Sequence, residues 1–213
     1  MKTNPRRTFL AAFLAVVLFV PLFIFRAVGP FDFWWWMSAN LALLLALSLL
    51  LDKGYLPFLL ADLRSRAAWK VGLGILAAGL LYAIFFAGNG LLRQILPFAG
   101  EGISRVYNFK EGAAPLRIVG LLFFLIGPGE ELFWRGFLQR RFQVHFGGLI
   151  GWLLATAVYA VVHAGSGNPM LVLAAAVCGL FWGFLFLRTR SLLLVAVSHT
   201  VWDLAVFILF PFS

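Results

Sequence analysis

Long apolar stretches recur along the chain and are separated by short polar segments. A membrane-spanning helix needs about 20 mostly apolar residues, and seven stretches come close to that length: 8–26, 33–51, 70–88, 116–141, 149–164, 170–187 and 191–210. Apolar residues run continuously through them instead of alternating with polar ones, which disfavours a β-barrel. The pattern predicts an all-α fold, a polytopic transmembrane helical bundle of about seven helices, with six to eight as the range.

Local features refine this prediction at several positions. The first stretch follows a basic N-terminus, as in a signal peptide, but Arg26 stands where a small-residue cleavage site is expected, so we interpret the stretch as the first membrane helix. Segment 88–115 mixes apolar and charged residues, which predicts an interfacial or re-entrant segment. The tryptophans at two helix starts are predicted to be interfacial anchors: Trp34, Trp35, Trp36 and Trp69.

The composition is that of a membrane protein. The 213 residues are 63% hydrophobic and 12% charged, with a mean hydropathy of +0.98, whereas soluble domains are about a quarter charged. No linker or compositional break divides the chain, so we expect one domain, residues 1–213. The single cysteine, Cys178, lies in an apolar run. It allows neither a disulfide nor a Cys-x-x-Cys metal pair within the chain, and we interpret it as a packing residue.

The net charge of +9 comes from basic residues that flank the apolar stretches. There they orient helices and meet lipid head groups, so we expect contacts with the bilayer and none with nucleic acid. With the N-terminus inside, the outer side carries only five of the 17 Lys and Arg residues: Arg26, Arg93, Arg105, Lys110 and Arg117. Because cytoplasmic loops are enriched in Lys and Arg, we expect an integral protein of the bacterial inner (plasma) membrane with a cytoplasmic N-terminus.

Ionisable residues also occur inside the predicted helices. A carboxylate near the bilayer centre costs about 2.5–3.5 kcal/mol on insertion scales, so such residues normally face a wet cavity, pair with each other or do chemistry. Five of them fall on three neighbouring helices: Glu130, Glu131, His163, His199 and Asp203. We therefore expect these five residues to form one site.

Spacing assigns partners within this group. Glu131 and Arg135 are four residues apart with the acid first, the favourable order for an ion pair. Glu130 points about 100° away around the helix and is left as the freer carboxylate. Two further pairs share a helical face at the same spacing: Tyr159 with His163, and His199 with Asp203. His145 falls in a predicted loop and is given no role.

The segment before the acid pair predicts a break in its helix. In Gly127-Pro128-Gly129 the proline removes a backbone donor and restricts the preceding residue. Glu130 is then expected in the first turn of a new helical segment. Counting about 1.5 Å per residue, Glu130 and His163 differ in depth by about 10 Å in a core about 30 Å thick. A break at this proline, or tilted helices, is expected to bring them level.

Three motifs follow one another along successive helices. Glu130-Glu131-Leu132-Phe133-Trp134-Arg135 reads EExxxR, Tyr159 and His163 frame an aromatic-xxx-His motif, and His199 and Asp203 frame HxxxD. In this order they resemble the motifs of the CAAX protease and bacteriocin-processing (CPBP, or Abi) family, which includes the type II CAAX prenyl endopeptidases. The resemblance covers about residues 116–205, which we expect to be the catalytic core.

The resemblance implies an intramembrane glutamate-type endopeptidase. It implies that Glu130 and His163 activate a water for attack on a peptide carbonyl, and that His199 and Asp203 hold the oxyanion. Glu131 and Arg135 would support the site, with Tyr159 beside His163. The implied partner is a membrane-anchored peptide or protein, cut at a membrane-proximal bond in a CAAX-type C-terminus, a leader peptide or a C-terminal sorting signal. No cofactor is expected.

Two departures from the family pattern keep other functions open. Tyr159 stands where the family often has Phe, and Asp203 stands where the prenyl endopeptidases have Asn. An ionised Asp203 would repel an oxyanion, so it must be protonated, orient His199 or bind a positive group. One alternative is a zinc-dependent metallopeptidase with His163, His199 and Asp203 as candidate ligands, although no HExxH occurs. The other is a non-catalytic membrane immunity or transport protein with buried ionisable groups.

Overall fold

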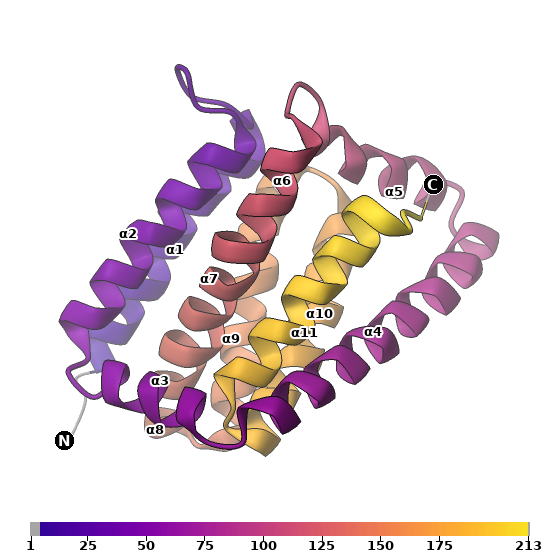
Figure 1. Ribbon diagram of the computed structural model, residues 1–213. Coiled ribbons are helices and arrows are strands. Elements are labelled where there is room, and N and C mark those ends of the chain that lie inside the picture. The colour runs from indigo at the N-terminus through magenta and orange to yellow at the C-terminus, as the bar shows by residue number, and fades with distance from the viewer. Residues whose placement is uncertain (1–4, 213) are drawn as a thin grey trace.

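The computed structural model describes residues 5–212, which form helices joined by short connections (Figure 1). The helices are α1 (Pro5–Phe25), α2 (Phe33–Leu51), α3 (Tyr55–Arg64), α4 (Ala67–Ile95), α5 (Ala99–Tyr107), α6 (Pro115–Leu121), α7 (Gly127–Glu131), α8 (Arg140–Phe146), α9 (Gly148–His163), α10 (Pro169–Thr189) and α11 (Leu192–Leu204). Figure 1 shows α1 and α2 on one flank of the bundle and α4 on the other. Lys2, counted in the basic N-terminal flank, lies outside the described residues.

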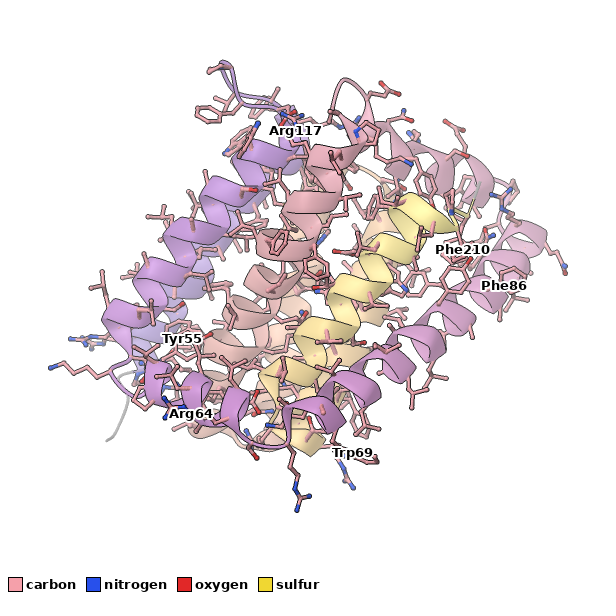
Figure 2. The ribbon with its side chains drawn as sticks, viewed as in Figure 1. Tyr55, Arg64, Trp69, Phe86, Arg117 and Phe210 are labelled. Carbon is pink, nitrogen blue, oxygen red and sulfur yellow. The ribbon has the colours of Figure 1, made fainter. Side chains whose placement is uncertain are left out.

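Six helices in the described part of the chain are long and apolar enough to cross a membrane, and a bent seventh candidate joins Ala99–Lys110 to Pro115–Phe146. This confirms the prediction of an all-α bundle with about seven membrane helices. Large apolar side chains cover the outer faces of the helices, with Trp69 and Phe86 of α4 among the most exposed (Figure 2). A bilayer accommodates such a surface and water does not, so the chain is an integral membrane protein.

Side-chain caps explain where several helices begin. The Asp32 side chain accepts a hydrogen bond from the backbone N–H of Trp35 at the start of α2. Asn168 caps α10 at the N–H of Met170, and Ser191 caps α11 at the N–H of Leu194. Each short polar side chain satisfies a donor that the first helical turn leaves without a partner. Polar residues that interrupt the apolar pattern therefore set the helix boundaries.

The Gly127-Pro128-Gly129 segment does not break its helix, contrary to the prediction. The backbone stays helical from Pro115 to Phe146, and we call Pro115–Phe146 the long helix. A proline ring clashes with the carbonyl four residues earlier in an α-helix. Here the turns Leu122–Ile126 are π-helical, and the N–H of Gly127 bonds to the carbonyl of Leu122 five residues back. The wider turn accommodates the proline, so Glu130 lies in mid-helix rather than in a first turn.

Gly127 allows two helices to pack closely and is not needed for backbone flexibility. A Cβ atom there would lie 2.5 Å from Oγ1 and 3.0 Å from Cα of Thr200 in α11. Only a residue without a side chain lets the two backbones come this close. The Gly-Pro-Gly segment is therefore the place where α11, which carries His199 and Asp203, presses against the long helix.

The connection between the long helix and α9 removes the expected difference in depth. The long helix continues to Phe146, and α9 starts at Gly148 after a single-residue turn at Gly147. Glu130 lies 17 residues before Gly147 and His163 lies 16 residues after it, which is about 25 Å along either helix. Because α8 and α9 pack side by side as an antiparallel hairpin, the two residues are level without any break.

The segment between α4 and the long helix caps one end of the bundle. The α4 helix continues to Ile95, seven residues beyond the predicted end, and α5 follows after a short turn. The segment Ala99–Lys110 makes an angle of 94° with the long helix, and Figure 1 shows α5 between the ends of α4 and α6. Residues 88–95 of the predicted interfacial or re-entrant segment therefore belong to α4, and the rest forms either a broken span or a re-entrant loop.

The long helix lies at the centre of the bundle. Its side chains Phe133, Trp134, Phe137 and Phe142 are at most 1% exposed, and its segments contact α1, α2, α9, α10 and α11. Glu130, Glu131 and Arg135 of the long helix are thus surrounded by protein rather than lipid. A buried carboxylate in this position must be neutralised or held by the neighbouring helices.

Candidate active site

A cavity of about 290 Å³ lies among the helices, mostly between apolar walls. Five of the residues predicted from the sequence line it: Glu130, Tyr159, His163, His199 and Asp203. They come from the long helix, α9 and α11. All five are buried, with exposed fractions of 3–7%. The structure therefore brings the residues of all three motifs together at one cavity, with Glu131 and Arg135 directly behind its wall.

Glu130 is held by α9. Its Oε2 atom accepts a hydrogen bond of 2.8 Å from the hydroxyl of Tyr159 and lies 3.7 Å from Nε2 of His199. The Tyr159 hydroxyl is therefore bonded to the carboxylate, while its ring lies beside His163 with centroids 4.7 Å apart. Because the Tyr159 bond uses one oxygen of the carboxylate, the other oxygen is available to a water or a substrate.

Glu131 forms the predicted ion pair with Arg135 and also a second contact. Its Oε1 atom lies 2.7 Å from Nη1 of Arg135 and 2.8 Å from Nδ1 of His199. The guanidinium group of Arg135 stacks 4.7 Å from the ring centre of Tyr159. A buried charge of this kind is costly unless it is paired and hydrogen-bonded. Glu131 thus neutralises the arginine and at the same time fixes one edge of the His199 ring.

His163 has its ring fixed by its own helix. Nδ1 lies 2.7 Å from the carbonyl oxygen of Tyr159. Since a carbonyl oxygen only accepts, Nδ1 carries the hydrogen, and Nε2 of the neutral ring is left as an acceptor. The ring also packs against Phe23 of α1, with centroids 4.6 Å apart. His163 is therefore oriented to accept a hydrogen bond at the cavity.

His199 is the point where the acidic side chains converge. Its Nδ1 contacts Glu131, whereas its Nε2 lies 3.5 Å from Oδ2 of Asp203 and 3.7 Å from Oε2 of Glu130. These last two distances exceed those of a direct hydrogen bond, but carboxylates at both edges of the ring favour the imidazolium form. Asp203 and His199 share a helical face, as their spacing predicts.

Two tryptophans contribute to the site although the sequence pattern assigned neither to it. Trp182 of α10 stacks on His199 with ring centres 3.8 Å apart, and its Nε1 donates to Oγ of Ser198. Trp34, predicted to be an interfacial anchor, is instead 2% exposed, lines the cavity and donates to the carbonyl of Phe109. Trp182 lies in an apolar run without a motif. Only contacts between helices reveal either role.

The remaining residues singled out by the sequence can also be placed. Cys178 is buried, as expected of a packing residue, and its side chain also lines the cavity. His145 lies at the opposite end of the bundle, with Nε2 3.5 Å from Oγ1 of Thr8. Within residues 5–212, no group of three His, Cys, Asp or Glu side chains has an arrangement suited to a metal ion, so His163, His199 and Asp203 do not form a ligand set here.

Comparison with known proteins gives one positive result. A family model described as "Type II CAAX prenyl endopeptidase Rce1-like" matches residues 112–205. This range includes the whole of the long helix, α9, α10 and the motif residues of α11. No curated protein and no solved structure gave a significant match. The match agrees with the resemblance seen in the motifs and favours a protease over a non-catalytic membrane protein.

Proposed function

Because residues 112–205 form a domain of the Rce1-like type II CAAX prenyl endopeptidase family, this chain is a membrane protease, and we propose that it uses a glutamate-activated water to hydrolyse a membrane-proximal peptide bond. The family is not known to depend on a metal. Each step below is therefore assigned to side chains of the chain itself. The proposal takes residues 1–213 as one unit with its catalytic core at about 116–205.

Glu130 is the proposed general base. Its free carboxylate oxygen takes a proton from a water in the cavity, and the resulting hydroxide forms a bond to the peptide carbonyl carbon. Nε2 of His163 accepts a hydrogen bond from the second hydrogen of this water and so aims its lone pair. The protonated Glu130 then gives its proton to the leaving nitrogen as the C–N bond breaks. A buried, positioned carboxyl group suits both transfers.

His199 is the proposed oxyanion donor. In the imidazolium form its Nε2–H faces the cavity, where a donor stabilises the negative charge that develops on the carbonyl oxygen. Asp203, 3.5 Å away, holds the positive charge of the ring at that edge, while Glu131 holds the opposite edge. This assignment gives Asp203 a positioning role, because its carboxylate balances the charge of the imidazolium and the pair presents no net negative charge to the oxyanion. Trp182 stacks on the His199 ring, and Arg135 acts on His199 through Glu131, which contacts both.

The proposed substrate is a membrane-anchored peptide or protein, since the cavity is enclosed by membrane helices and has mainly apolar walls. The candidate bonds lie in a CAAX-type C-terminus, a leader peptide or a C-terminal sorting signal. We place the protein in the bacterial inner membrane with its N-terminus in the cytoplasm. The distribution of basic residues between the two ends of the bundle supports this orientation.

The buried contact of Glu130 with Tyr159 at a cavity shared with both histidines is the observation that carries the proposal. Membranes containing the wild type or the Glu130→Gln variant are compared for peptide products by mass spectrometry, which also reads the cleavage site. We expect Glu130→Gln to abolish the product, and the exposed-residue control Glu101→Gln to retain it. If the Glu130→Gln variant still cleaved the substrate, the glutamate mechanism would be wrong. Activity is expected to survive exhaustive chelation.

A further inference from the structure

The two ends of the bundle differ strongly in charge. Among residues 5–212, one end, which we call the basic end, carries two acidic residues, Asp52 and Asp62, and these basic ones: Arg6, Arg7, Lys53, Arg64, Arg66, Lys70, Arg140, Arg141, Arg188 and Arg190. The other, the cavity end, carries these ionisable residues: Arg26, Asp32, Arg93, Glu101, Arg105, Lys110, Glu111 and Arg117. Figure 2 shows Arg64 and Arg117 at opposite ends.

Contacts between helices confirm that the basic residues belong to one end. Arg140 of α8 pairs with Asp52 after α2, and Lys70 of α4 pairs with Asp62 of α3 at 2.6 Å. Arg190 after α10 donates to Gln143 of α8. Lys and Arg are enriched on the cytoplasmic side of membrane proteins, because positively charged loops resist translocation. The basic end therefore faces the cytoplasm, and the cavity end faces the opposite side of the membrane.

The cavity extends only toward the cavity end. Beyond the polar cluster its lining includes Phe23 near the end of α1, Phe33 at the start of α2, Leu92 near the end of α4 and Ile103 of α5. No residue of α3 or α8, at the basic end, lines it. On that side Gln139 of the long helix is buried and donates to the carbonyl of Gly183. A separate hollow between α3, α4 and α11 reaches Pro128 and Leu132 but is not lined by Glu130. The cavity thus gives a peptide access to Glu130 from the cavity end.

We infer that the active site opens on the non-cytoplasmic face and that its substrate is a translocated polypeptide, still membrane-anchored, with bulky apolar residues beside the scissile bond. Aromatic side chains line the cavity, among them Phe23, Phe33, Trp34, Phe85, Phe109 and Phe207. Such walls desolvate apolar side chains and leave the polar cluster for the peptide bond. A prenylated C-terminus in the cytosol would lie on the opposite side of the membrane from the opening of the cavity. The substrate part of this inference rests on the proposed function; the orientation does not.

Cysteine labelling tests the orientation of the chain in the membrane and does not depend on enzyme activity. In a Cys178→Ala background, Glu111→Cys adds a thiol at the cavity end and Lys53→Cys adds one at the basic end, both at exposed positions. A membrane-impermeant maleimide is applied to intact bacterial cells, and labelling after permeabilisation measures the total inserted protein. We expect Glu111→Cys to label in intact cells, and Lys53→Cys to label only after permeabilisation. The reverse pattern, or labelling of both variants in intact cells, overturns the inference.

Sealed vesicles of known orientation test on which side of the membrane the substrate is cleaved. Anchored peptides with bulky apolar flanks are added to sealed right-side-out and inverted vesicles that contain the full chain or its Glu130→Gln variant. We expect a Glu130-dependent product at least ten times more abundant in right-side-out vesicles. A larger yield in inverted vesicles overturns the inference. Cleavage that is the same in the Glu130→Gln variant overturns the proposed function but leaves the labelled orientation standing. Absence of any product in either preparation overturns the substrate assignment.

Discussion

The hydroxyl of Tyr159 donates a 2.8 Å hydrogen bond to Oε2 of Glu130 and so joins α9 to the middle of the long helix. The same residue offers its backbone carbonyl to His163. One residue therefore orients both members of the proposed water-activating pair. Because α9 and the long helix form a hairpin, this link is held by the fold rather than by a flexible loop.

Replacement of Tyr159 by Phe is expected to lower kcat about tenfold or more. A hydrogen bond to a charged group contributes about 1.5–3 kcal/mol, and its loss leaves the Glu130 carboxylate free to rotate away from the water. The backbone bond to His163 remains, so the fold should be retained. Tyr82→Phe is the matched control, because that hydroxyl donates to the carbonyl of Phe210. An unchanged kcat in Tyr159→Phe would remove the positioning role.

Glu131→Gln is expected to destabilise the protein strongly. Arg135 is 2% exposed, and removing one partner of a buried ion pair costs about 3–5 kcal/mol because the other charge is left unpaired. Thermal unfolding in detergent measures the loss. The double variant Glu131→Gln, Arg135→Met should be more stable than Glu131→Gln alone.

The surface pair of Glu101 and Arg105 is the control for this experiment. Its atoms lie 3.7 Å apart and both side chains are largely exposed, so the pair contributes only about 0–1 kcal/mol. Glu101→Gln should unfold at the wild-type temperature. If Glu131→Gln also did so, the buried pair would not be needed for the fold.

Asp203 is expected to tolerate Asn better than Ala. Asn keeps an oxygen acceptor near Nε2 of His199, whereas Ala removes it. We expect kcat within about threefold of the wild type for Asp203→Asn and at least about tenfold lower for Asp203→Ala, since Ala leaves the buried imidazolium without a polar group at that edge. Steady-state kinetics separate kcat from KM. If both variants were equally inactive, the negative charge rather than the acceptor would be essential.

Two glycines of the long helix should respond in opposite ways to Ala. At Gly127 a new Cβ would meet Thr200 at 2.5 Å, whereas at Gly120 nothing lies within 4 Å. We expect Gly127→Ala to lose about 1–3 kcal/mol of stability through overpacking. Gly120→Ala should gain up to about 1 kcal/mol from helix propensity. Equal unfolding temperatures for the two variants would contradict the close approach of α11.

Features that depend only on residues close together in the sequence were predictable from the sequence. The membrane helices followed from the length of apolar runs, and Glu131 with Arg135 and His199 with Asp203 followed from a spacing of four residues. Each needs only the geometry of a single helix. The error at Gly127-Pro128-Gly129 has the same origin, because local propensity disfavours an α-helix there, while a π-helical turn and the packed Thr200 accommodate the segment.

The sequence by itself determined that this chain is a helical membrane protein and which ionisable residues gather in the middle of its helices, since both follow from the cost of placing polar groups in lipid. Tertiary structure alone decided their partners: Tyr159 to Glu130, Glu131 to His199, and Trp182 against the His199 ring. It also decided that Glu130 and His163 are level and that the cavity lies at the less basic end. These relationships join residues on different helices, and only packing between helices determines which side chains meet.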